Sequence, residues 1–111
     1  MKTILVVGRD WKSRALLRAQ LREEGYEALG FETLEHAESE AAGAAALIFD
    51  TSDSPPSDWQ PILQRLAAQL PVVVVAGASE EITLAPAQLL RRPVRIGDII
   101  TVVQKLTSAA P

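Results

Sequence analysis

Residues 4–10 read ILVVGRD, and this stretch decides the fold. Four consecutive aliphatic residues so near the start of the chain predict a strand that is buried on both faces. Strands of this kind occur in parallel sheets that helices cover on each side. The apolar run stops at Gly8-Arg9-Asp10, which predicts a loop at the carboxyl end of a central strand. In open α/β sheets, ligand sites lie at this end of the strands.

The remainder of the chain alternates helix and strand patterns. Gly25 is placed to end the first helix, and Thr33 can cap the second. Ser57 and Gln60 have the spacing of a capping box for the third helix. The alternation predicts an α/β fold with a parallel sheet and helices on both faces. The expected strands are residues 4–7, 26–31, 45–49, 71–76 and 88–90, and the expected helices are residues 11–24, 34–43, 57–69 and 96–106.

The composition is that of a globular protein of one domain, with 111 residues, 48% of them hydrophobic. The absence of cysteine excludes disulfides, thiolate metal sites and cysteine nucleophiles. The single histidine, His36, leaves little material for a histidine metal site or a Ser-His catalytic pair. No apolar run approaches the ~18 residues of a membrane span. No signal peptide is evident, so we expect a cytoplasmic protein without membrane contact.

Charge is distributed unevenly along the chain, which has a net charge of −3. Residues 23–64 contain acidic residues but no Lys or Arg. Arg14, Arg18 and Arg22 form a like-charged stripe on the first helix. The stripe is either a solvated face or a docking surface, and the overall acidity argues against direct nucleic-acid contact. Trp11 and Trp59 are interpreted either as half-exposed anchors for a partner or as residues of ordinary packing, and the sequence leaves both interpretations open.

Several segments occur in the order and spacing of a known family. They are ILVV at residues 4–7, Gly25-Tyr26, the strand that ends in Asp50, LPVV at residues 70–73, and Arg92-Pro93-Val94. Over residues 1–106 the chain resembles the CheY-like receiver domain of bacterial response regulators. The resemblance implies a flavodoxin/CheY-like α/β fold with a five-stranded parallel sheet in the order 2-1-3-4-5. The segment between Ala76 and Arg92 is short for the family, so the fourth helix is expected to be shortened or missing.

The resemblance also assigns the positions of a phosphotransfer site. The family has two acids after the first strand, an acceptor Asp after the third, a hydroxyl after the fourth, and a Lys before a Pro after the fifth. The acids and the acceptor hold Mg²⁺, a hard cation that prefers oxygen ligands. The acceptor position is kept here as Asp50, whereas the acid pair falls on Gly8 and Arg9, the hydroxyl on Ala76, the Lys on Arg92, and an aromatic signalling position on Leu89.

The charges at these positions predict an inactive site. Asp50, Arg9 and Arg92 sum to one positive charge, where the family's three acids and one lysine sum to two negative charges. Arg9 would stand in place of the metal and pair bidentately with Asp50. We therefore expect no metal, no cofactor and no efficient phosphoryl transfer. Asp10, one position beyond the second acid, is the alternative ligand if the alignment is shifted.

These expectations favour a pseudo-receiver, a non-enzymatic module that regulates signalling through protein–protein contacts and without phosphorylation. Two alternatives remain: a phosphoacceptor receiver that uses Asp50, and a small-ligand sensor at the carboxyl-end crevice. A dinucleotide site at Gly8 is not supported, because the G-x-G-x-x-G pattern is absent.

The expected partner is another protein or an output domain of the same chain. Residues 107–111 have the composition of a linker, and degenerate receivers of this kind stand at the N-terminus of enhancer-binding transcription activators. A homodimer is left open. The expected interaction surface consists of Arg14, Arg18, Arg22, Leu89 and Arg95.

Overall fold

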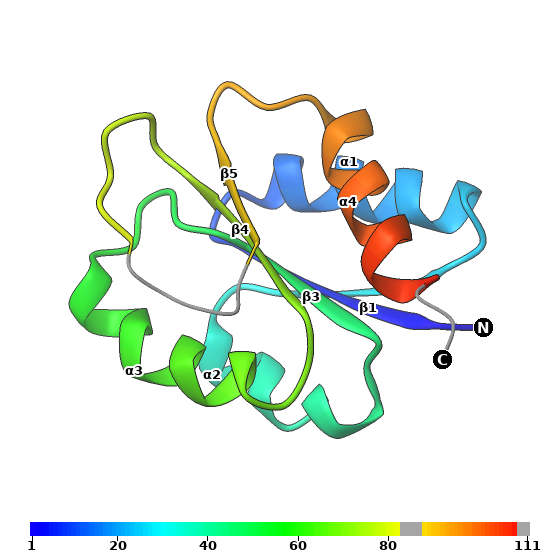
Figure 1. Ribbon diagram of the computed structural model, residues 1–111, viewed down its shortest axis with the longest axis horizontal. Coiled ribbons are helices and arrows are strands. Elements are labelled where there is room, and N and C mark those ends of the chain that lie inside the picture. The colour runs from blue at the N-terminus through cyan, green and yellow to red at the C-terminus, as the bar shows by residue number, and fades with distance from the viewer. Residues whose placement is uncertain (83–87, 109–111) are drawn as a thin grey trace.

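The protein is a five-stranded parallel sheet with helices on both faces (Figure 1). The computed structural model describes residues 1–82 and 88–108. The strand order is β2-β1-β3-β4-β5, which confirms the predicted fold class and topology. The strands are β1 (Thr3–Val7), β2 (Glu27–Phe31), β3 (Ala46–Asp50), β4 (Val72–Ala76) and β5 (Gln88–Arg91).

Helices α1 (Trp11–Glu23) and α4 (Ile96–Thr107) cover one face of the sheet, and α2 (Leu34–Glu38) and α3 (Pro56–Ala67) cover the other. The expected caps are present, since Thr33 accepts from the His36 amide and Gly25 follows α1 with a φ of +93°. The helix expected over residues 34–43 is interrupted, because α2 ends at Glu38 and a 3₁₀ turn spans Ala41–Gly43. Residues 77–82 contain no helix, and residues 83–87, the rest of the segment where the fourth helix was expected to be shortened or missing, lie outside the described part.

Alternation along β1 divides the interior into two hydrophobic layers. Ile4 and Val6 pack toward α1 and α4, whereas Leu5 and Val7 pack toward α2 and α3. Successive side chains of a strand point to opposite faces, so a strand apolar at every position must be covered twice. The same alternation continues past the end of β1, so Gly8 and Arg9 face opposite sides of the sheet.

The start of α3 differs from the prediction. The helix begins at Pro56 with Pro55 as its N-cap, and no side chain caps it, so the capping box predicted for Ser57 and Gln60 is wrong. A proline at the first helical position has a suitable φ and lacks the N–H that would need a partner. Trp59 is 3% exposed, so of its two interpretations the structure supports ordinary packing and not a half-exposed anchor.

The arginine stripe of α1 covers the outer edge of the sheet. Arg18 Nε lies 3.1 Å from the Ala28 carbonyl oxygen and Arg22 Nη2 lies 3.4 Å from it. Every second residue of β2 forms backbone hydrogen bonds to β1. Ala28 is not one of these residues, so its carbonyl points outward from the edge of the sheet. A Cβ on Gly30 would lie 2.9 Å from Arg18 Cδ, so this glycine makes room for the arginine. The stripe is therefore a structural clasp as well as a charged surface.

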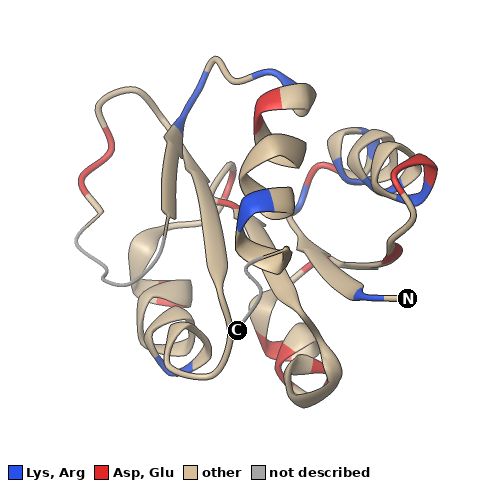
Figure 2. Cartoon of the chain, turned by 45° about the vertical axis from the view of Figure 1, so that its right-hand side comes forward, with Lys and Arg blue, Asp and Glu red and all other residues tan. Residues whose placement is uncertain are grey.

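The charges predicted to be uneven along the chain are also uneven in space. Blue segments mark the basic residues of α1, while red segments gather on α2 at the opposite face (Figure 2). Glu38 of α2 is paired with Arg65 of α3 through two bonds of 3.0 and 3.1 Å. None of the helices in the described ranges, 1–82 and 88–108, has both the length and the apolar character that crossing a bilayer requires.

Candidate functional site

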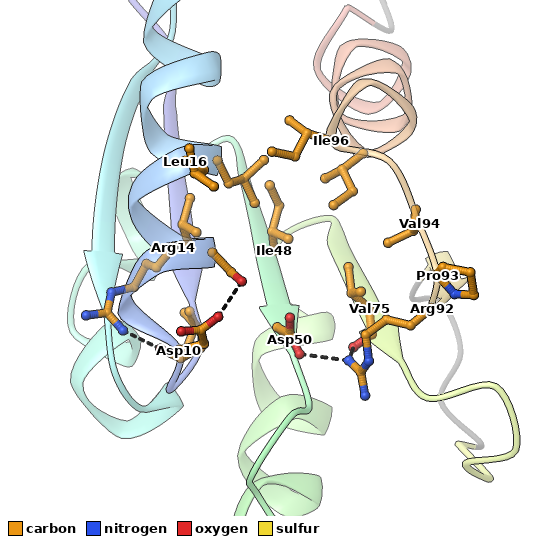
Figure 3. Close-up of a pocket in the computed structure, with 16 residues that line it drawn as sticks. Asp10, Arg14, Leu16, Ile48, Asp50, Val75, Arg92, Pro93, Val94 and Ile96 are labelled. Atoms are coloured by element: carbon orange, nitrogen blue, oxygen red, sulfur yellow. Dashed lines mark hydrogen bonds and ion pairs between the residues drawn. The ribbon is translucent and has the colours of Figure 1, made fainter.

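The candidate site lies where β1, β3 and β4 end at the carboxyl edge of the sheet. Gly8 follows β1, Asp50 closes β3, and Arg92 follows β5. Side chains of these segments and of α1 line a cavity of about 560 Å³ (Figure 3). The cavity brings together five of the predicted residues, which are Gly8, Asp10, Arg14, Asp50 and Arg92.

Asp50 and Arg92 form the central ion pair. Arg92 Nη1 donates to Asp50 Oδ1 at 2.8 Å and to the Val75 carbonyl oxygen at 3.1 Å. Asp50 Oδ1 also accepts from the Ser52 amide at 2.8 Å. The Arg92 amide bonds to the Ala76 carbonyl oxygen at 2.7 Å, which fixes the backbone that carries the guanidinium. Both side chains are about one-third exposed, at 34% and 29%.

The predicted bidentate pair between Arg9 and Asp50 is wrong, because the partner of Asp50 is Arg92. Side-chain alternation gives the reason. A Cβ on Gly8 would lie 3.3 Å from the Cβ of Asp50, so position 8 faces the acceptor and position 9 faces away. Arg9 is exposed and lines a second cavity, of about 300 Å³, beside Glu32 and Asp58. Ala76 is fully buried in the layer beneath α2 and α3, so it does not line the cavity with Asp50.

Asp10 is the N-cap of α1. Its oxygens accept from the Ser13 hydroxyl at 2.6 Å and from the Lys12 amide at 3.4 Å. The Ser13 bond is the main cause of a lowered Asp10 pKa, and the Lys12 and Ser13 amides add to it. A carboxylate at the N-cap stabilises the start of a helix. This structural role explains an aspartate at position 10 without a bound metal.

The oxygen ligands needed for Mg²⁺ do not come together at Asp50. The two positions that carry acids in the family hold Gly8 and Arg9, and one oxygen of Asp50 is bonded to Arg92. Across residues 1–82 and 88–108, no three His, Cys, Asp or Glu side chains are grouped as a metal site would require. The residues present do not fit a bound Mg²⁺ ion, and no reaction step through this metal follows from them.

Glu80 belongs to the site, although sequence reasoning missed it. Its Oε1 accepts from the Thr51 hydroxyl at 2.7 Å and from the Gly77 amide at 2.9 Å, and it lies 3.9 Å from Arg92 Nη2. Burial would raise the Glu80 pKa, but the Gly77 amide, the Thr51 hydroxyl and Arg92 outweigh it and lower the pKa. Arg91 Nη1 donates to the carbonyl oxygens of Gly77 and Glu80, which ties the start of the loop to β5.

Arg92→Ala is expected to lower the free energy of unfolding by about 1–2 kcal/mol, because the Asp50 carboxylate loses its charged donor. The estimate is at the low end for a charged hydrogen bond, since solvent screens a pair that is one-third exposed. Arg92→Lys keeps the charge but loses the planar guanidinium, whose Nη1 donates to both acceptors, so a smaller loss is expected. Urea unfolding measures both variants. Arg65→Ala, which removes a more exposed pair, is the control and should cost about 0.2–1 kcal/mol. An equal or larger loss in the control would contradict the importance of Arg92.

Glu80→Gln is expected to remove part of the stability lost on acidification. A carboxylate with a lowered folded-state pKa stabilises the fold above its unfolded value, which is near 4.5, and this contribution is lost as pH falls through the folded value. The stability difference between the unmutated protein and Glu80→Gln should therefore shrink below pH 4.5. Urea unfolding at a series of pH values measures the difference, with exposed Glu81→Gln as the control. A difference that grows on acidification would contradict this assignment.

Comparison with known proteins gives a match in structure but not in sequence. No family model matches the sequence, and no curated protein matches it either. A response regulator receiver protein from Burkholderia phymatum is 20% identical, with a TM-score of 0.75 over 99% of this chain and 98% of that chain. A CheY-like receiver domain protein from Methanospirillum hungatei is 12% identical, with a TM-score of 0.77 over 96% of this chain and 94% of that one. This chain has the fold of a response-regulator receiver domain.

One structure with this receiver fold is much longer than the present chain. NtrX from Brucella abortus, solved in complex with ADP, is 21% identical with a TM-score of 0.75. The match covers 97% of this chain but 26% of that chain. In that protein, therefore, the receiver fold makes up only part of the polypeptide.

Of the residues predicted to form an interaction surface, Arg14 lines the cavity with Asp50, whereas Leu89 and Arg95 do not. Leu89 is on β5, where it is 37% exposed, and Arg95 is the exposed N-cap residue of α4. Arg14 is half buried and donates to the Gly8 carbonyl oxygen, which joins the arginine stripe to the edge of the cavity.

Proposed function

We propose that this chain is a pseudo-receiver, a regulatory module of bacterial signal transduction that binds other proteins without being phosphorylated. The proposal rests on the receiver fold together with the groups around Asp50. The observation that carries it is the pairing of the Asp50 carboxylate with Arg92, while the neighbouring position, Gly8, supplies no second carboxylate. A phosphoryl group needs its negative charge balanced during transfer, and the site lacks the acids that would hold Mg²⁺ for this purpose.

The position at which the family carries a hydroxyl residue supports the same proposal. In the family, a Thr or Ser after the fourth strand responds to the phosphoryl group, and here that position is the buried methyl group of Ala76. The hydroxyl of Thr51 is bonded to Glu80 and to the Val75 carbonyl oxygen. The aromatic position on the fifth strand is Leu89. A phosphorylation signal would lack the family's hydroxyl and its aromatic relay.

The proposed partner is a protein, either separate or an output domain of the same polypeptide. The arrangement of NtrX, in which the receiver fold is a minor part of the chain, supports an attached output domain. The proposed contact surface is the arginine face on α1 and at the start of α4, formed by Arg14, Arg18, Arg22 and Arg95. Leu89 of β5 is in register with Val74 and lies on the α2–α3 side of the sheet, so it is not part of this face. A charged surface of this kind steers association with an acidic partner and weakens as salt rises. We place the module in the cytoplasm, where bacterial response regulators work.

One observation favours the alternative of a phosphoacceptor. Asp50 contacts Arg92, which stands where the family has its lysine, so this part of the acceptor site keeps its charge pattern. Arginine carries the same charge but is larger and already has two acceptors, Asp50 and Val75. The two functions are separated by whether Asp50 accepts a phosphoryl group.

Incubation with acetyl phosphate and Mg²⁺ is expected to leave the intact mass of the protein unchanged. Beryllofluoride with Mg²⁺ is expected to leave the fluorescence of Trp11, an exposed residue next to Asp10, unchanged. A receiver that is known to be active serves as the positive control in the same buffer. A phosphoryl adduct that disappears in Asp50→Asn would establish the phosphoacceptor function and overturn the pseudo-receiver.

A further inference from the structure

One carboxylate oxygen at the carboxyl edge of the sheet faces donors from the ends of three strands. Glu80 Oε1 accepts from the Thr51 hydroxyl, just after β3, at 2.7 Å and from the Gly77 amide, just after β4, at 2.9 Å. It also lies 3.9 Å from Nη2 of Arg92, which follows β5. In open α/β sheets, ligands bind outside the carboxyl ends of the strands. Here a side chain of the protein itself occupies such a position.

The donors around this oxygen suit an anion. Among residues 1–82 and 88–108, Thr51 is the one polar residue that is buried, with 3% of its surface exposed. A buried hydroxyl needs an acceptor, and Glu80 is closer to it than the Val75 carbonyl oxygen, which lies at 3.4 Å. Backbone amides and guanidinium groups are donors that bind oxyanions strongly. The three donors therefore form a site for a carboxylate or a similar group.

Arg92 serves two carboxylates through different nitrogen atoms. Its Nη1 donates to Asp50 at 2.8 Å, whereas Nη2 faces Glu80, so the two acids do not compete for one N–H. Burial alone would raise the Glu80 pKa, but the Gly77 amide, the Thr51 hydroxyl and Arg92 lower it overall. The surroundings of Glu80 thus favour its anionic form.

The backbone around Glu80 holds its carboxylate against the donors. The Glu80 amide bonds to the Gly77 carbonyl oxygen at 3.3 Å and closes a short turn. Arg91 Nη1 donates to the carbonyl oxygens of Gly77 and Glu80 at 2.8 and 2.6 Å. A ligand that is tethered and preorganised in this way has a high effective concentration at its site. An anion from solution would have to displace it.

We infer that Glu80 is an internal ligand, which fills an oxyanion site formed by Thr51, Gly77 and Arg92. It holds the ends of β3, β4 and β5 in one arrangement without an external anion. A small carboxylate from solution can take this place only when the side chain of Glu80 is removed. The consequence rests on the proposed function: a module whose site is filled by its own side chain presents the same surface to its partner with or without a signal.

Rescue of Glu80→Ala by acetate tests the inference. This variant removes the carboxylate and leaves space at the three donors, so its Tm is expected to fall by about 5 °C. Sodium acetate should restore about half of this loss or more, and the effect should saturate, because a ligand that binds only the folded state stabilises it. Sodium chloride at the same ionic strength should not restore it.

Matched variants locate the bound acetate. Glu80→Gln fills the same space without a charge, so acetate should not raise its Tm. Glu81→Ala removes an exposed acid one residue away, and acetate should affect it no more than the unmutated protein. Thr51→Val in the Glu80→Ala background removes one donor with little change of shape and should weaken acetate binding about tenfold. Circular dichroism checks that each variant is folded.

The amide resonance of Gly77 reports the contact directly in a proton–nitrogen correlation spectrum. A hydrogen bond to a carboxylate moves an amide proton downfield, so both Glu80→Ala and Glu80→Gln should move this resonance upfield. Acetate should reverse the change in Glu80→Ala and leave Glu80→Gln as it is. If Glu80→Ala does not fold, the Gly77 resonance of Glu80→Gln decides the question.

Three results would overturn the inference. They are stabilisation of Glu80→Ala by acetate that is no greater than by chloride, equal stabilisation of Glu80→Ala and Glu80→Gln by acetate, and a Gly77 resonance that stays in place in Glu80→Gln. These experiments use neither Mg²⁺ nor a phosphoryl donor. Their failure is therefore distinguishable from a phosphoryl adduct on Asp50, which is the result that overturns the pseudo-receiver.

Discussion

The double variant Gly8→Asp/Arg9→Asp is expected to bind Mg²⁺ saturably, whereas the unmutated protein is expected to show no measurable binding by calorimetry. The change supplies the two carboxylates that the family carries at these positions. Because a Cβ at position 8 lies 3.3 Å from the Cβ of Asp50, the first new carboxylate is adjacent to the acceptor. A charge pair at about 4 Å contributes about 4 kcal/mol at an effective dielectric constant near 20, so a gain in affinity of at least about a hundredfold is expected.

The same variant should be less stable than the unmutated protein when Mg²⁺ is absent. Neighbouring carboxylates repel one another, and the close Cβ approach forces Asp50 to move by a few tenths of an ångström. Added Mg²⁺ should restore the lost Tm, because a ligand that binds only the folded state stabilises it.

The matched control for this variant is Arg95→Asp/Gly97→Asp. It makes the same change of composition at the start of α4, where a Cβ on Gly97 meets nothing within 4 Å. This control should gain no Mg²⁺ affinity, and Asp50→Asn in the Gly8→Asp/Arg9→Asp background should abolish the gain. Tight Mg²⁺ binding by the unmutated chain would contradict our account of the site.

Trp59→Ala is expected to lower the free energy of unfolding by about 3–5 kcal/mol, the range for removal of a buried aromatic side chain. Trp59 is 3% exposed, and its ring packs edge-on against Phe49 with centroids 5.3 Å apart. Its Nε1 also donates to the Ser54 carbonyl oxygen at 3.1 Å, which holds the loop between β3 and α3. Urea unfolding followed by circular dichroism measures the loss without relying on tryptophan fluorescence.

The second tryptophan provides the control. Trp11 is 64% exposed, and Lys12 Nζ lies 5.9 Å from its ring centroid. Trp11→Ala should therefore change stability by no more than about 0.5 kcal/mol, the usual range for surface substitutions. Trp59→Phe keeps an aromatic ring and should lose less than Trp59→Ala. Similar losses for Trp11→Ala and Trp59→Ala would contradict the different burial of the two residues.

The fold could be predicted because its signals are local and repeated. Continuous aliphatic runs at residues 4–7 and 72–75 require burial on both faces, and the helices between them enforce parallel strands. Gly25 and Thr33 mark a helix end and a helix start through backbone chemistry that depends little on distant residues. The start of α3 was predicted one residue too late, because both Ser57 and the Pro55-Pro56 pair are residues that can begin a helix.

The candidate site was predicted only in part. Asp50 was identified as its centre, but its partner was assigned to Arg9 when it is Arg92, 42 residues away. Alternation along β1 was the available signal, since Gly8 continues the side of Val6 and Arg9 the side of Val7. Glu80 carried no such signal, because its bonds to Thr51 and Gly77 depend on the path of a loop that the pattern of the sequence does not determine.

The arginine clasp on β2 affects how easily another molecule can pair with this edge of the sheet. The outermost strand of a sheet presents unpaired backbone groups, which can template the addition of a strand from another molecule. Arg18 and Arg22 already occupy the outward carbonyl of Ala28, and Arg18 lies across Gly30. A strand that approached this edge would have to displace both guanidinium groups and meet their charge. The arginines of the first helix therefore oppose the edge-to-edge pairing of two sheets at β2.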